Sequence, residues 1–168
     1  MKHLLFDFNK VLLFPKHSIP VDLIMMLHHK LDPRNVENYQ ANIDFKYYFE
    51  WNTELLNWLT SLKKSNSDVS LHIYTNSTFS IKIGDSQEKL KPLFSSQYLA
   101  KEIKQPKDTA SSYEWLSREL SAKPTQLFFT DDTATNVMAA AQAGLWTHHY
   151  TENEPLFAEI EAFLNGNK

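Results

Sequence analysis

Three short apolar segments that each end in polar or acidic side chains constrain the fold of this chain most strongly. Short, nearly continuous apolar runs are typical of strands buried on both faces of a parallel sheet. Ligands bind at the carboxyl ends of such strands, so polar residues there indicate one shared site. The three segments are residues 2–8 with Asp7, Val69 to Tyr74 followed by Thr75, and Gln126 to Thr130 followed by Asp131 and Asp132.

Segments with helical periodicity separate these runs, and two further short strands are expected at Phe94 to Leu99 and Leu145 to Tyr150. The alternation predicts a three-layer α/β fold, with helices on both faces of a Rossmann-like parallel sheet. Gly144 follows an alanine-rich segment and predicts the C-terminal end of that helix. The expected helices are residues 20–31, 51–64, 79–91, 108–120, 134–143 and 154–164.

Glycine is unusually rare in this chain, with 3 residues where average usage would give about 12. The three are far apart, which excludes a Walker-type phosphate loop and a GxGxxG dinucleotide loop. The absence of cysteine excludes disulfides, thiolate metal sites and a thiol nucleophile. Any phosphate chemistry must therefore use side chains or the backbone of other residues.

The formal net charge of −3 indicates neither nucleic acid nor an anionic membrane as a partner. No apolar run approaches the length of a membrane span, and Asp7 interrupts the only stretch that resembles a signal peptide. We therefore expect a cytoplasmic protein. The oligomeric state is not predicted.

Four segments carry residues suited to phosphate chemistry: Phe6 to Leu12, Ile73 to Asn76, Lys107 with Tyr113, and Phe129 to Asp132 with Asn136. In this order they resemble the motifs of the haloacid dehalogenase (HAD) superfamily of phosphatases. The last of them is the most specific, because its acidic pair leads into a helix of the NVxAAxxAG type. Phospho-receiver domains use similar residues, but their acidic pair follows the first strand, whereas here it comes last.

The resemblance implies a Mg²⁺-dependent phosphohydrolase that acts on a phosphorylated substrate through an aspartyl-phosphate. A carboxylate can attack phosphorus, and the developing charge needs a metal, a cation and hydrogen-bond donors. By resemblance, Asp7 is the nucleophile, and Mg²⁺ is held by Asp7, the Asn9 carbonyl, Asp131 and Asp132. Lys107 would neutralise charge, and Thr75 and Asn76 would bind the phosphate.

Asn9 departs from the family pattern, in which this position carries the aspartate that protonates the leaving group and activates water. An amide cannot act as a general acid or base. Three interpretations follow: a leaving group that needs little protonation, a proton donor elsewhere such as His3, His17 or His28, or a weakly active phosphate-binding or regulatory module. Phosphotransfer to an acceptor other than water is a further possibility.

The resemblance also implies a reduced cap, formed by residues 15–50 and inserted into a core of residues 1–14 and 51–168. We expect the aromatic residues at the end of this insertion to pack against the core, with a substrate platform as the alternative. Lys10 replaces the usual glycine and is expected to be a solvated turn residue, or else a cation near the phosphate. No metal role is expected for the pairs His28–His29 and His148–His149.

Overall fold

The computed structural model describes residues 1–30, 45–77 and 88–166. Its centre is a five-stranded sheet in the order β5-β4-β1-β6-β7, in which every neighbouring pair is parallel. The predicted α/β fold with a parallel sheet is therefore confirmed. The strands are β1 (Lys2–Phe6), β4 (Val69–Thr75), β5 (Ser96–Leu99), β6 (Leu127–Asp131) and β7 (Trp146–His149).

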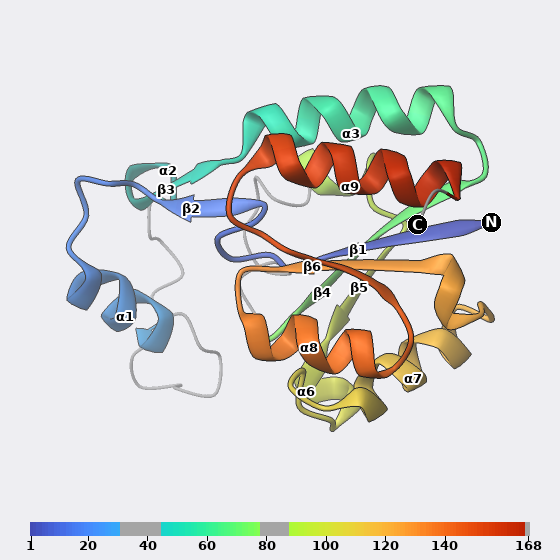
Figure 1. The fold of residues 1–168 in the computed structure, drawn as a ribbon. Coiled ribbons are helices and arrows are strands. Elements are labelled where there is room, and N and C mark those ends of the chain that lie inside the picture. Colours follow the sequence, from blue (N-terminus) through green and yellow to red (C-terminus); the bar gives the residue numbers. More distant parts are fainter. Residues whose placement is uncertain (31–44, 78–87, 167–168) are drawn as a thin grey trace.

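Helices cover both faces of the sheet, with α3 and α9 on one side and α6, α7 and α8 on the other (Figure 1). Successive β1 residues alternate between the faces: Leu4 and Phe6 pack in one hydrophobic cluster, and Leu5 packs in the other. Because both faces are covered, the strand reads as a continuous apolar run. The helices are α3 (Thr53–Ser65), α6 (Ala100–Ile103), α7 (Ala110–Glu119), α8 (Ala134–Gln142) and α9 (Asn153–Asn165).

An antiparallel hairpin, which the sequence did not predict, joins the two ends of the insertion. Its strands are β2 (Leu13–Pro15) and β3 (Phe49–Trp51), with α1 (Val21–Lys30) and α2 (Phe45–Tyr48) between them. Because the strands pair, the chain leaves and re-enters the core at adjacent points.

The helix predicted for residues 51–64 begins later than expected. Trp51 lies in β3, and α3 begins at Thr53. Asn52 sets this boundary, because its side chain accepts a hydrogen bond from the Leu55 amide and donates one to the Val11 carbonyl. A capping asparagine satisfies a free amide at the helix start, which explains the shift.

The aromatic residues around the end of the insertion divide between the core and the surface. Phe49 is buried, and the Trp51 ring meets the Phe8 ring edge-on at 5.9 Å between centroids. Tyr47 is exposed, and the side chain of Phe45 lies outside the described part. The packing interpretation is supported for Phe49 and Trp51.

The other predicted elements agree with the structure to within a few residues. Gly144 adopts the left-handed conformation, with φ 86°, directly after the end of α8. Residues 79–87 of the helix predicted over 79–91 lie outside the described part, and a short 3-10 turn, η2 (Pro124–Gln126), was not predicted. No described helix has the length and apolar character needed to cross a membrane.

Candidate active site

The polar residues that end three neighbouring strands lie at the same edge of the sheet, as the sequence predicted. Asp7 follows β1, Thr75 ends β4, and Asp131 ends β6 with Asp132 behind it. The Asp7 amide donates to the Thr130 carbonyl at 2.9 Å, which continues the β1–β6 pairing up to the acidic residues. The parallel register thus places acids far apart in sequence side by side.

Lys107 enters this edge from the segment between α6 and α7. Its ammonium donates to Asp7 at 2.7 Å, to Asp131 at 2.6 Å and to the Tyr74 carbonyl at 3.0 Å. The side chain is 2% exposed, and the Tyr113 hydroxyl donates to the Lys107 carbonyl at 2.8 Å. All three ammonium hydrogens therefore have protein acceptors, and the lysine is held rigidly between two carboxylates.

The charges in this buried group oppose one another. Burial raises the pKa of Asp7 to about 6; the charge of Asp131 adds to this rise, and Lys107 opposes it. Burial by itself would lower the pKa of Lys107, but the two carboxylates outweigh it and hold that pKa above its ordinary value. Lys107 therefore stays protonated, and Asp7 is ionised at neutral pH.

The two acids of the Asp131–Asp132 pair have different surroundings. Asp131 is fully buried and accepts from the Thr133 amide at 2.8 Å and the Asn136 side chain at 3.0 Å. The Asp132 side chain is 24% exposed and lies 3.4 Å from the Lys10 ammonium. Asp131 therefore organises the loop and Lys107, while Asp132 lies at the edge of the group and is partly open to solvent.

The three carboxylates could hold a divalent cation together. Asp7, Asp131 and Asp132 each offer an oxygen, and these oxygens all lie within 4.8 Å of one another. Hard oxygen ligands of this kind suit Mg²⁺. Among the described residues, these three carboxylates face the ammonium groups of Lys107 and Lys10, so the cluster keeps a net negative charge that favours a bound cation. The donor set thus fits the predicted metal.

The remaining predicted site residues are less closely joined to the carboxylates. Asn9 is half-buried and forms an isolated bridge with Leu13 in the turn after β1. Thr75 is buried, and its hydroxyl accepts from the Ser77 amide at 3.0 Å. Asn76 is exposed and lines a shallow hollow of about 300 Å³ that none of the three carboxylates lines.

The histidines considered as proton donors occupy three different environments. His3 is buried and lies 3.0 Å from His72 through ring nitrogens. It precedes Asp7 by four strand residues, about 13 Å, which removes it from the site. His17 is exposed and lines a cavity near the carboxylates, whereas the side chain of His28 lies outside the described part.

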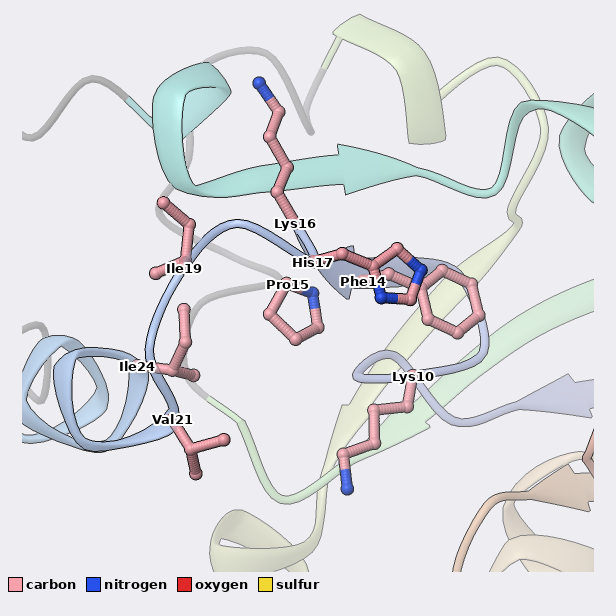
Figure 2. A pocket seen from close by; sticks show the side chains of 8 residues that line it. All are labelled: Lys10, Phe14, Pro15, Lys16, His17, Ile19, Val21 and Ile24. Carbon is pink, nitrogen blue, oxygen red and sulfur yellow. The ribbon is translucent and has the colours of Figure 1, made fainter.

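This cavity has a volume of about 430 Å³ and lies between the turn after β1, the end of β2 and the start of α1 (Figure 2). Lys10 joins it to the carboxylate edge, because this residue lines the cavity and also contacts Asp132. The other lining residues are Phe14, Pro15, Lys16, His17, Ile19, Val21 and Ile24.

Sequence reasoning missed two contacts of Asp132. It favoured Lys10 as a solvated turn residue, and the ammonium does remain largely exposed, but it also pairs with Asp132. His149 Nε2 lies 3.0 Å from the Asp132 carbonyl oxygen, so the ring donates to it. The sequence feature that could have indicated His149 is its position near the end of the last predicted strand. In the structure, that position pairs in register with Asp131.

Comparison with known proteins gives matches among solved structures. No protein-family model matches the sequence. No curated protein matches it either. A predicted HAD-like family hydrolase from Porphyromonas gingivalis superimposes with a TM-score of 0.67 and 17% identity, over 98% of each chain.

Two further structures show the same similarity. A HAD family enzyme from Bacteroides thetaiotaomicron, solved with magnesium and inorganic phosphate, has a TM-score of 0.63 and 16% identity, over 94% of this chain and 99% of that one. A predicted phosphoglycolate phosphatase from Haemophilus somnus has a TM-score of 0.58 and 18% identity, over 87% and 83%.

The sheet and its acidic edge define a three-layer α/β protein with a carboxylate site at the C-terminal ends of the strands. The chain has the fold of the haloacid dehalogenase superfamily, as its motifs predicted.

Proposed function

We propose that this protein is a Mg²⁺-dependent phosphohydrolase that forms an aspartyl-phosphate on Asp7. The observation that carries the proposal is the buried arrangement in which Lys107 bridges Asp7 and Asp131 beside Asp132. A Bacteroides thetaiotaomicron enzyme of the same fold, solved with magnesium and phosphate, supports it.

In the first step, an Asp7 carboxylate oxygen attacks phosphorus and the bond to the leaving oxygen breaks. The electron pair departs with that oxygen, and Asp7 becomes an acyl phosphate. Water then attacks the same phosphorus, the bond to Asp7 breaks, and the carboxylate is regenerated. Inorganic phosphate retains the two hydrogens of the water, so atoms and charge balance.

Mg²⁺ would be held by Asp7, Asp131 and Asp132, with the Asn9 carbonyl as a further ligand, and would neutralise phosphoryl charge when bound. Lys107 acts mainly by orienting Asp7, because its three hydrogens are already bonded to protein acceptors. Thr75 and Asn76 are proposed as phosphate donors at the neighbouring strand end.

Asn9 directs the proposal towards substrates with good leaving groups, since an amide provides no proton at neutral pH. It also supports the alternative function, a phosphate-binding or regulatory module with little turnover. In both cases we propose that residues 15–50 form a small cap, whose two ends are joined by the β2–β3 hairpin.

Turnover of an aryl phosphate with Mg²⁺ tests the proposal. We expect Asp7→Asn to lower kcat by at least about 10³-fold, because the nucleophile is lost. Asp68→Asn, an exposed acid at the amino end of β4, is the matched control and should keep wild-type activity. Mg²⁺ and phosphate binding without turnover would favour the binding module, whereas equal activity of the Asp7 variant would refute the mechanism.

A further inference from the structure

We propose that the cavity beside Lys10 binds the aromatic leaving group of an aryl phosphate and that Lys10 stabilises the oxygen that departs. This inference rests on the proposed function, because the phosphoryl group must lie at Asp7. It goes further by naming the class of substrate and the residues that select it.

The position of the cavity follows from the fold. Helix α1 and the end of β2 lie beyond the C-terminal edge of the sheet, on the side where β1 ends (Figure 1). The Lys10 ammonium is 3.4 Å from Asp132, and Asp132 is within 4.8 Å of Asp7 through carboxylate oxygens. One lysine side chain therefore separates the carboxylates from the cavity, as a leaving group attached to a bound phosphate requires.

The turn after β1 holds the backbone of Lys10 in an unusual conformation. The residue has φ 57°, in the left-handed region that few residues other than glycine adopt. Its amide donates to the Leu13 carbonyl at 2.7 Å, so the turn holds the conformation. Strained residues that the surrounding structure maintains occur frequently at functional sites.

The lining of the cavity determines the class of ligand. Five residues provide apolar surface: Phe14, Pro15, Ile19, Val21 and Ile24. The other three, Lys10, Lys16 and His17, are basic, and no acidic side chain lines the cavity among the described residues. An apolar ring that gains negative charge on its oxygen matches such a lining, whereas a sugar or a cationic group does not.

The charged groups at the carboxylate edge of the sheet favour the same class of ligand, an aryl phosphate. Within the described ranges, the lysines in ion-pair contact with the carboxylates are Lys107 and Lys10. Lys107 is fully bonded, and Asn9 provides no proton. Of the three basic residues described in the cavity lining, Lys10 is the one that contacts the carboxylates, so it is the cation nearest the departing oxygen. An aryloxide can depart unprotonated beside this ammonium and take its proton from water afterwards, whereas an alkoxide cannot do so readily.

Two phosphonates test the inference by binding alone. Benzylphosphonate resembles an aryl phosphate but cannot be hydrolysed, and methylphosphonate lacks the ring. With Mg²⁺ present, calorimetry should show benzylphosphonate binding at least about tenfold more tightly, because the ring enters an apolar cavity. Val21→Asp should remove most of this advantage and leave methylphosphonate binding unchanged.

Val21 suits this test because it lines the cavity yet is 75% exposed, so an aspartate there does not disturb the core. Met25→Asp is the matched control, since Met25 is 68% exposed on the same helix but does not line the cavity. Methylphosphonate binding without a benzyl advantage, or equal losses in both variants, would overturn this inference alone. Binding of neither phosphonate would overturn the proposed function together with it.

Discussion

In the part of the chain that the structure describes, two lysines contact the carboxylate cluster, one from inside the fold and one from the surface. Lys107 is 2% exposed and lies 2.7 Å from Asp7 and 2.6 Å from Asp131. The Lys10 side chain is 65% exposed and lies 3.4 Å from Asp132. Both are lysine–aspartate pairs at the same strand edge, and they differ in how much water surrounds them.

The difference in exposure separates two roles. Exposed ion pairs contribute about 0–1 kcal/mol, because water and salt screen them. Removing one partner of a buried pair costs about 3–5 kcal/mol, because an uncompensated charge remains in the interior. We therefore expect Lys107 to support both fold and site, and Lys10 to be free to act on the substrate.

The largest expected effect tests the buried contacts of Lys107 with Asp7 and Asp131. Lys107→Met should lower the free energy of unfolding by about 3–5 kcal/mol, because Asp7 and Asp131 would face each other without a cation. Urea unfolding at pH 7 measures this. In Lys107→Met/Asp7→Asn, part of the loss should return, since one of the two charges is gone. A loss below about 1 kcal/mol would show that the interior tolerates these charges.

The buried His72 ring extends the comparison between buried and exposed charges, because burial there disfavours the charged form. Burial, together with the nearby charges of His3 and Lys63, lowers the pKa of His72 from 6.5 to about 4. The folded state prefers the neutral ring, so this stability is complete above pH 6.5 and is lost as the pH falls from 6.5 to 4. Between pH 7 and pH 4.5 the cost should be about 2 kcal/mol.

Urea unfolding of His72→Phe at both pH values measures this contribution. The variant should lose about 2 kcal/mol less than the wild type over this interval, since it has no ring to protonate. His17→Phe is the control, because that ring is exposed on the insertion. Equal pH dependence of the unfolding free energy in His72→Phe and the wild type would show that His72 does not titrate as described.

The smallest expected effect tests the exposed Lys10–Asp132 pair. Lys10→Met should reduce kcat/KM about tenfold for aryl phosphates with the most basic leaving groups, and little for the most acidic ones. The slope of log kcat/KM against leaving-group pKa should therefore become steeper. Lys64→Met, an exposed lysine on α3, should leave this slope unchanged. A uniform loss across the series would indicate a structural role for Lys10.

The sheet and its acidic edge were largely predictable, and the cavity was not. The apolar runs that end in Asp7, Thr75 and Asp131 mark buried parallel strands, and their periodicity is local. The hairpin of β2 and β3 escaped prediction because its strands have three residues each and pair across the whole insertion. Since that hairpin positions Phe14 and Pro15, the cavity could not be inferred beforehand.

Among the site residues, the acids were easier to place than their partners. Strand ends locate Asp7 and Asp131 in space once a parallel sheet is assumed. Nothing local places Lys107 between them, 100 residues after Asp7, and only the resemblance to a known family suggested it. The pairing of Lys10 with Asp132 had no sequence signal beyond an unusual residue in a turn.

The sequence by itself determined the alternation of strands and helices and the acidic strand ends. These features depend on residue type and local period, which can be read along the chain. The tertiary structure decided the strand order, the burial of Lys107, and the cavity that begins at Lys10. These depend on contacts between distant residues and on exclusion of water, which local patterns do not encode.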